Sequence, residues 1–326
     1  MVRRQHVLPA IQPTIERTFG LFGDAVVLQT NEPLIAELAE ASFGHFALSA
    51  GAVPVTVRVL VEDQAHSDHA GILHRTDGQH YLVSPVGSAA VVDLVGATAT
   101  SWIDRSALAD PARLRYTYIE GPALGMLVAS RGYFALHASG VSREGAGVAL
   151  HGPEGAGKTT LAVACARRGL DVFAEDGVFV RAGRDGLEFW GLPWIQRLVP
   201  DARDLFPELA GMEAIRQPNL EMKLEVELER YYPGRSRPDA HPAAVVVLAR
   251  EDGAGEAVVL LDEAEKKDLV EVQAPWSLEW SEQHEKAAAL LDALPVYRLY
   301  VNGTPDEAVD LIEELLAELA PMPLEA

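Results

Sequence analysis

The chain has 326 residues, and its 27 lysines and arginines against 48 aspartates and glutamates give a net charge of −21. The length indicates about two domains, and 48% hydrophobic with 23% charged residues is typical of a folded globular protein. So acidic a chain is a poor match for nucleic acid, which is bound through a basic face. Its apolar runs are shorter than the ~20 residues of a membrane span. We therefore expect neither nucleic acid nor a membrane among its partners.

Cysteine usage indicates the compartment. Cys165 is the only cysteine, so no internal disulfide can form, and this fits a reducing environment. No early apolar segment resembles a secretory signal. We expect a cytoplasmic protein in which Cys165, in the middle of a predicted helix, is inert core.

Residues 1–132 are predicted to form the smaller, mixed α/β domain, with a regulatory or substrate-recruiting role. Asn31 is placed to cap a helix over Ala36–Phe46. Three strands are predicted after it: Val53–Val61, Tyr81–Ser84 and Ala90–Val95. Strands in succession predict a small, largely antiparallel sheet.

Two further features precede the domain boundary. One polar stretch contains four histidines: His66, His69, His74 and His80. We interpret this stretch as a hairpin, because no cysteine or helical i, i+4 pair supports a metal site. A helix is predicted within 113–131, with Pro122 suited to a first turn.

From Tyr133 onward, strand, loop and helix alternate, which predicts a mainly parallel sheet in a second α/β domain, residues 133–326. The predicted strands are Tyr133–Leu136, Gly147–Leu150 and Leu170–Ala174, and the predicted helices are Thr160–Arg168 and Asp306–Leu319. The first of these strands is expected to neighbour the second.

The strongest signal is Gly152-Pro153-Glu154-Gly155-Ala156-Gly157-Lys158-Thr159, which fits the P-loop pattern G-x-x-x-x-G-K-[ST] at every fixed position. Its glycines let backbone N–H groups face phosphate oxygens, and the following helix adds its positive dipole end. Lys158 supplies charge for the β- and γ-phosphates, and the Thr159 hydroxyl is placed to ligate Mg²⁺. ATP and Mg²⁺ are thus the expected cofactors. The nucleotide-binding residues are Gly152, Gly155, Ala156, Gly157, Lys158, Thr159 and Thr160.

Acidic residues lie within this loop and at the end of the next predicted strand. Glu154 puts a carboxylate inside a loop that should hold anions; it either points to solvent or reaches the metal and tunes affinity. Glu175 and Asp176 end the next predicted strand, where one acid can ligate magnesium while the other accepts a proton. His137 ends an earlier strand, where it either contacts the γ-phosphate or relays a proton, or is simply a buried histidine.

The order of these elements resembles the catalytic domain of HPr kinase/phosphorylase. In that family a His-Gly-Val segment precedes the P-loop, and an Ala-Asp-Asp segment ends the following strand. The matching segments here are His137-Ala138-Ser139-Gly140-Val141, the P-loop, and Ala174-Glu175-Asp176. The segment Pro193–Asp201 is closer to HPr-kinase-like proteins found with peptide-modifying enzymes, which carry Pro-x-x-x-Arg-Leu-x-Pro-Asp. The resemblance covers about residues 130 to 300.

The resemblance implies roles for several residues. Glu175 and Asp176 supply the base and a metal ligand, Glu188 helps to hold magnesium, and His137 lies against the transferring phosphate. Arg197 and Lys223 are weaker candidates for phosphate contact, with ordinary surface cations as the alternative. Assembly into a homo-oligomer is also implied, since full-length HPr kinases form rings.

Three departures separate the chain from the full enzyme. Glu175 replaces the family's first aspartate, Trp190 stands where the family has arginine, and only Pro233-Gly234-Arg235 remains of a longer phosphorylase signature. They argue against the reverse, dephosphorylating reaction and against HPr as the substrate.

The leading hypothesis is therefore an ATP- and Mg²⁺-dependent kinase acting on a serine or threonine hydroxyl of a peptide or small protein, with Trp190–Arg203 forming part of the acceptor groove. The alternative is that the apolar residues of this segment cover a sheet edge. The alternatives are a kinase of a small metabolite such as free serine, a nucleotide-dependent sensor without turnover, and a carboxykinase, for which the chain is short and poor in metal ligands.

Overall fold

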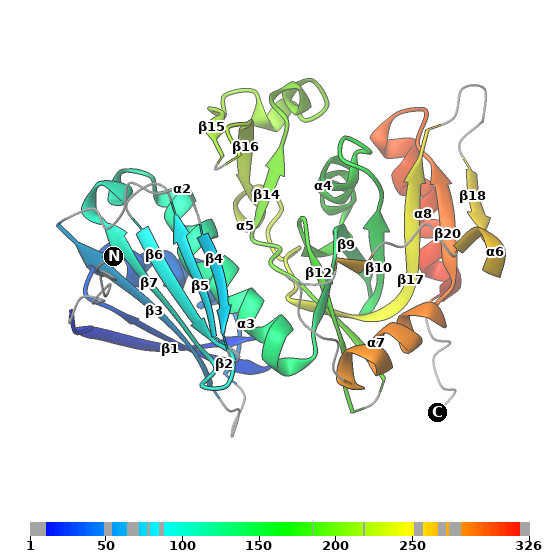
Figure 1. Cartoon of the computed structure of the whole chain (residues 1–326). Coiled ribbons are helices and arrows are strands. Elements are labelled where there is room, and N and C mark those ends of the chain that lie inside the picture. Colours follow the sequence, from blue (N-terminus) through cyan, green and yellow to red (C-terminus); the bar gives the residue numbers. More distant parts are fainter. Residues whose placement is uncertain are drawn as a thin grey trace. The chain divides into compact units, whose positions relative to one another are not determined.

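The computed structural model describes residues 11–48, 54–63, 72–76, 79–84, 88–184, 186–217, 219–250, 257–266, 272–273 and 282–319. The chain divides into two compact units, Met1–Leu127 and Val128–Ala326 (Figure 1). Within the described ranges, no helix is both long and apolar enough to span a membrane.

Unit 1 is built on a seven-stranded sheet with the order β1-β2-β3-β7-β6-β5-β4. The strands are β1 (Ile15–Leu21), β2 (Asp24–Thr30), β3 (Pro54–Glu62), β4 (Ile72–Thr76), β5 (Gln79–Ser84), β6 (Ser88–Asp93) and β7 (Thr98–Asp104). The neighbours β2–β3 and β3–β7 are parallel, and the other four pairs are antiparallel. The sheet is thus largely antiparallel, as predicted; the parallel pair β2–β3 is made possible by a helical crossover.

That crossover contains α1 (Pro33–Phe43), which begins three residues before the predicted helix. The prediction that Asn31 caps it is wrong. The Asn31 side chain instead donates to the carbonyl of Val61 (2.9 Å) and accepts from its N–H (2.8 Å). Glu32 occupies the N-cap without a side-chain hydrogen bond, and Pro33 suits the first helical position because its missing N–H needs no partner there.

The predicted helix over 113–131 is a succession of shorter helical pieces. They are α2 (Pro111–Arg113), the π-helical η2 (Leu114–Glu120) and α3 (Gly121–Arg131), preceded by η1 (Arg105–Ala109). In the hairpin β4–β5, His74 is opposite Tyr81 and His80 is opposite Arg75 in the backbone register. His66 and His69 lie outside the described residues.

Unit 2 contains a ten-stranded sheet with the path β11-β9-β10-β17-β13-β12-β8-β19, and β20 pairs with both β17 and β18. The strands are β8 (Phe134–Leu136), β9 (Ala138–Arg143), β10 (Ala146–His151), β11 (Asp171–Ala174), β12 (Val178–Ala182), β13 (Leu187–Trp190), β17 (Asp239–Ala249), β18 (Ala257–Leu260), β19 (Val272–Gln273) and β20 (Val296–Tyr300).

Two sequence predictions about this sheet are wrong. Only β10–β17 and β17–β20 pair in parallel; the remaining pairs of the described strands are antiparallel. The strand β8 pairs with β12 and β19, so the neighbours of β10 are β9 and β17. The reason is that the short connection Glu144–Gly145 turns β9 back on β10 as a hairpin, which leaves no room for β8.

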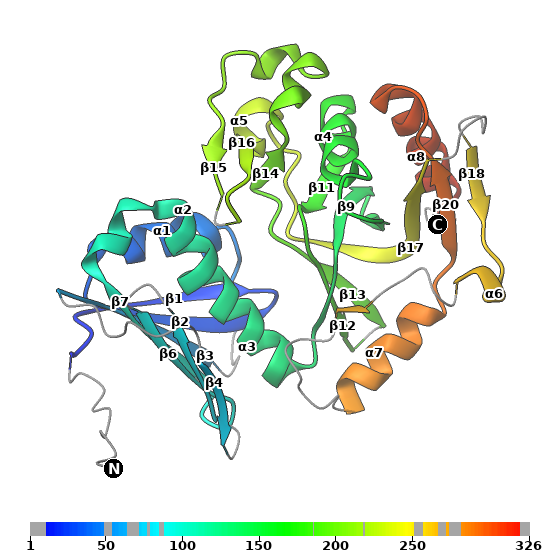
Figure 2. The ribbon, with the colours of Figure 1, turned by 45° about the horizontal axis from the view of Figure 1, so that its top comes forward.

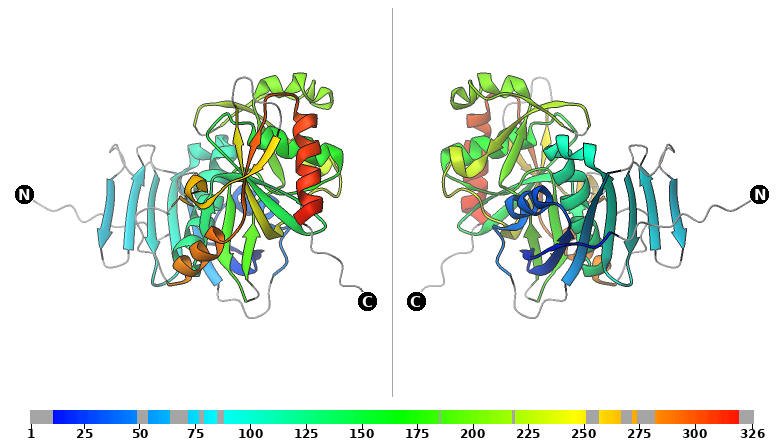
Figure 3. Two further views of the ribbon diagram at one scale, coloured as in Figure 1. Left: turned by 90° about the vertical axis from the view of Figure 1, so that its right-hand side faces the viewer. Right: turned by 90° about the vertical axis from the view of Figure 1, so that its left-hand side faces the viewer.

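The central strands bury both faces. In β10, Val148 and Leu150 belong to one hydrophobic cluster and Ala149 to the other. Helices α4 (Lys158–Arg168) and α8 (Pro305–Leu319) pack on the first face, and α7 (Glu282–Asp292) packs on β12 and β13 (Figures 2 and 3). Such two-sided burial explains why β10 and β17 read as continuous apolar runs.

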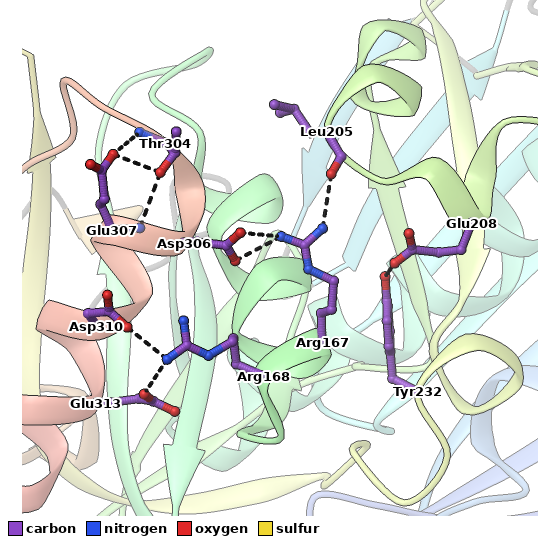
Figure 4. Close-up of polar contacts among 10 residues, drawn as sticks. All are labelled: Arg167, Arg168, Leu205, Glu208, Tyr232, Thr304, Asp306, Glu307, Asp310 and Glu313. Atoms are coloured by element: carbon purple, nitrogen blue, oxygen red, sulfur yellow. Dashed lines mark hydrogen bonds and ion pairs between the residues drawn. The ribbon is translucent and has the colours of Figure 1, made fainter.

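Helices α4 and α8 are joined by polar contacts as well (Figure 4). Arg167 donates two hydrogen bonds to Asp306, and Arg168 pairs with Asp310 and Glu313. At the start of α8, Thr304 and Glu307 form a capping box: the Glu307 carboxylate accepts from the Thr304 N–H at 2.8 Å.

A separate three-stranded sheet, β14-β16-β15, lies against α4. Its elements and the remaining short helices are β14 (Ile195–Leu198), β15 (Ile215–Arg216), β16 (Met222–Glu227), η3 (Pro200–Asp204), η4 (Pro207–Leu209), α5 (Leu228–Tyr231) and α6 (Glu263–Lys266). Leu224 and Val226 of β16 are buried in the cluster that contains α4. Alternation therefore turns Lys223 and Glu225 to the opposite face.

Candidate functional site

Strand direction brings four segments to one edge of the unit 2 sheet. β9 is antiparallel to both β10 and β11, and β17 is parallel to β10. The carboxyl ends of β10, β11 and β17 therefore meet the amino end of β9 at this edge. The residues placed there are His137, the loop after His151, the pair Glu175–Asp176, and Arg250. Carboxyl ends of parallel strands are a common position for ligand sites in α/β sheets.

The loop between β10 and α4 has the backbone that its glycines predict. Gly155 and Gly157 have φ values of 77° and 96°, in the region that glycine favours, and Gly157 is the N-cap of α4. The predicted strand and helix flank the loop, with α4 starting two residues before the prediction and ending at Arg168 as expected. Thr159 and Thr160 lie half-buried in the first turn of α4. The loop thus leads directly into the N-terminus of α4.

Lys158 is folded back over the loop. Its Nζ donates to the carbonyls of Gly152 (2.9 Å) and Pro153 (3.1 Å), and the residue is 7% exposed. Burial lowers the pKa of Lys158, while the negative charges of Asp176, Glu154 and Glu175 act to raise it. The three acids are therefore the electrostatic neighbours of this ammonium group.

Asp176 and His137 lie together at the sheet edge. His137 Nε2 is 3.5 Å from Asp176 Oδ1, and their side chains are 34% and 57% exposed. The His137 carbonyl is 3.1 Å from His151 Nδ1, which ties the start of β9 to the end of β10. The exposed Asp176 carboxylate is thus accessible to an incoming molecule and has an imidazole beside it.

Glu175 is in a different environment from its neighbour. Its carboxylate is buried and accepts hydrogen bonds from the Arg197 backbone N–H (3.3 Å) and guanidinium (3.0 Å). Arg197 Nε is also 3.6 Å from Glu225, which in turn accepts from Gln217 at 3.1 Å. Burial raises the pKa of Glu175 to about 7, against the lowering effect of Arg197. Ser139 Oγ donates to the Glu175 carbonyl.

The structure does not bring Glu188 to this group. It lies on β13, where its carboxylate accepts from the Arg181 guanidinium (2.8 Å) and from Trp190 Nε1 (3.1 Å). Trp190 and Arg181 of β12 are therefore the partners of Glu188.

The other cations predicted near phosphate have carboxylate partners. Lys223 Nζ is 2.9 Å from Glu221, and Arg197 is shared by Glu175 and Glu225. Glu154 is exposed, as in the solvent-facing interpretation. The hydrogen bond and charge of Lys223 are the main reasons why the pKa of Glu221 is lowered.

The segment Trp190–Arg203 contains more regular structure than predicted. Residues 195–198 form strand β14, and Leu198 is 1% exposed in the core that contains α4. Leu198 is therefore part of the core and is not available to an acceptor. Trp194 and Ile195 are half-buried.

Sequence reasoning missed Arg250. It follows β17, is exposed, and has its Nη2 4.0 Å from the position that a Cβ on Gly157 would occupy. A cation directly after the apolar run Ala243–Ala249 is the signal that could have identified it, but only once β17 is known to run parallel to β10.

The residues at this edge offer oxygen ligands of the kind that Mg²⁺ prefers, a hydroxyl on Thr159 and a carboxylate on Asp176. No group of three or more His, Cys, Asp or Glu side chains in the described part of the chain is arranged to hold a metal ion. A magnesium site that uses nucleotide phosphates needs only one or two protein carboxylates.

No family model matches the chain, and no curated protein matches its sequence. Among solved structures, it is similar to the Hpr(Ser) kinase/phosphatase from Coxiella burnetii at 10% sequence identity with a TM-score of 0.33. The similarity covers 57% of this chain and 99% of that chain. The class of protein that the structure defines is a mixed α/β protein with several sheets.

Proposed function

We propose that the chain is an ATP- and Mg²⁺-dependent phosphotransferase of the HPr-kinase-like type, acting on a serine or threonine hydroxyl of a peptide or small protein. One observation carries the proposal: the loop with the P-loop pattern meets the exposed Asp176 and the half-buried His137 at one sheet edge, and the Asp176 charge acts on Lys158 of that loop. A phosphate-binding loop beside an accessible carboxylate is the minimum that phosphoryl transfer to a hydroxyl requires.

Phosphoryl transfer would proceed as an in-line displacement. The bond between the γ-phosphorus and the β–γ bridging oxygen breaks, a bond from the acceptor oxygen to the γ-phosphorus forms, and ADP leaves. Asp176 takes the hydroxyl proton, and Lys158 with the N-terminus of α4 faces the phosphates. Thr159 and Asp176 are the residues that would hold Mg²⁺, which neutralises phosphate charge when bound. Glu175, held by Arg197, fixes the strand end from which Asp176 projects.

The test is Asp176→Asn in the full chain, assayed with Mg²⁺–ATP and a mixture of serine- and threonine-containing peptides, with phosphopeptide read by mass spectrometry. We expect transfer to fall by about 10²-fold or more, with ATP binding retained. Asp292→Asn, an exposed aspartate at the end of α7, is the matched control and should behave as wild type. Undiminished transfer by Asp176→Asn would remove Asp176 from the mechanism.

Magnesium titration of the same variant separates the two roles of Asp176. If the carboxylate serves mainly as proton acceptor, excess Mg²⁺ does not restore transfer; if it serves as metal ligand, activity recovers partly as Mg²⁺ rises.

A second candidate is a nucleotide-dependent binding module without turnover. The burial of Glu175 against Arg197 favours it, because that carboxylate is already engaged. ATP binding by the wild-type chain with no phosphopeptide and no ATP hydrolysis would select this function.

A further inference from the structure

We infer that Arg250 is a second cationic phosphate ligand of the site, acting on the nucleotide from the strand next to the loop. The inference rests on the proposed function, since it assigns a residue to the same nucleotide. The strand β17, which Arg250 follows, lies beside β10, which precedes the loop.

The pairing of these two strands is well defined. Four successive residues of each strand are in parallel register, ending at His151 opposite Val247. Beyond that point, a Cβ built on Gly152 would lie 3.3 Å from the Leu248 carbonyl, so the two chains remain adjacent where the loop begins. β17 continues to Ala249, and Arg250 therefore leaves the sheet alongside the loop.

The guanidinium lies at the helix end of the loop. Arg250 Nη2 is the heavy atom that a Cβ on Gly157 would meet, at 4.0 Å. Gly157 is the N-cap of α4 and directly precedes Lys158. The side chain is exposed, and no ion pair joins it to another of the described residues. As far as the described residues go, its hydrogen-bonding fork is thus available to a ligand at this position.

The charge around the loop indicates why a second cation is needed. Lys158 is electrostatically coupled to three carboxylates, those of Asp176, Glu154 and Glu175. Arg197 is paired with Glu175 and Glu225, and Lys223 is paired with Glu221. A polyphosphate entering this acidic region gains from a guanidinium that binds phosphate oxygens in a bidentate manner. Arg250 is positioned to supply it.

The experiment is calorimetric titration of the full chain and its variants with Mg²⁺–ATP and Mg²⁺–ADP. We expect Arg250→Ala to weaken the binding of both by about tenfold or more. Arg250→Lys keeps the charge but not the planar fork, and should recover only part of the loss. Arg143→Ala is the matched control: Arg143 is exposed, and it pairs with Ala146 at the start of β10, a strand length of roughly 20 Å from the loop. It should bind as wild type.

Lys158→Ala, measured in parallel, distinguishes the two possible failures. Loss of binding in Lys158→Ala with wild-type affinity in Arg250→Ala overturns the inference and leaves the proposed function intact. Absence of ATP binding in the wild-type chain overturns both. Equal weakening in Arg250→Ala and Arg143→Ala also overturns the inference, because it reduces the effect to net charge. Thermal unfolding midpoints confirm that each variant is folded.

Discussion

The adjacent acids Glu175 and Asp176, which follow β11, differ in burial and in their partners. Glu175 turns inward to Arg197 and is buried, whereas Asp176 is exposed beside His137. Both residues lie in the bend that follows the last strand residue, Ala174, and the two side chains leave this bend toward different surroundings. This division favours Asp176 as the reacting acid and Glu175 as its support.

The buried position of Glu175 predicts a pH dependence of stability. Its pKa is raised by burial from 4.5 to about 7 in the folded chain. Between these values the folded chain binds more protons than the unfolded chain, so the free energy of unfolding falls as pH rises, by at most roughly 1.4 kcal/mol per pH unit, and levels off above pH 7. Glu175→Gln should remove this part of the slope, as measured by urea unfolding from pH 4 to pH 8.

A matched variant shows whether the slope belongs to this residue. Glu227→Gln changes an exposed glutamate of the three-stranded sheet that carries Arg197 and should leave the wild-type profile unchanged. An identical slope in wild type and Glu175→Gln would contradict the raised pKa.

At the scale of elements, α4 has a glycine with a positive φ at each end, and its N-terminal end faces the site. The helix ends at Arg168, and its C-cap Gly169 adopts a φ of 102° and donates its N–H to the Ala166 carbonyl. An L-residue is strained in this conformation, although a Cβ there would meet nothing within 4 Å. Gly169→Ala should therefore lower the free energy of unfolding by about 1 kcal/mol.

Gly211 provides the control for that measurement. A Cβ on Gly211 also meets nothing within 4 Å, and its φ is outside the left-handed region. Gly211→Ala should be neutral or raise stability by up to about 1 kcal/mol, because it restricts the unfolded chain. Equal destabilisation by both substitutions would show that backbone strain is not the cause.

Helices, strands and loops that a short stretch of sequence specifies could be predicted. The pairing of the strands with one another could not. The loop between β10 and α4 follows from fixed glycine and lysine spacing within eight residues, and the alternating valines of β3 follow from strand periodicity. The order of strands depends on contacts between distant segments. A parallel sheet was predicted because strands and helices alternate, yet the tight turn at Gly145 folds β9 back on β10. Arg197 reaches Glu175 across 22 residues and from another sheet, for which no sequence period exists.

At the scale of the whole molecule, the candidate site belongs to one unit. The loop, Asp176, His137 and Arg250 all lie beside strand ends within Val128–Ala326, and this unit has its own hydrophobic core on both faces of its sheet. Unit 1 has a separate sheet with its own buried residues. A domain with an independent core is expected to fold alone.

This organisation predicts that a fragment starting at Gly121, which keeps α3 whole, folds cooperatively and binds Mg²⁺–ATP with the affinity of the full chain. Circular dichroism during thermal unfolding and calorimetric titration check the two statements. Introducing Lys158→Ala into the fragment should abolish the binding, as in the full chain, and so shows that the same loop is responsible. A fragment that folds but has lost affinity would make unit 1 a contributor to nucleotide binding. Retained affinity with lost transfer to peptides would instead assign unit 1 to the acceptor, the recruiting role expected for the N-terminal domain.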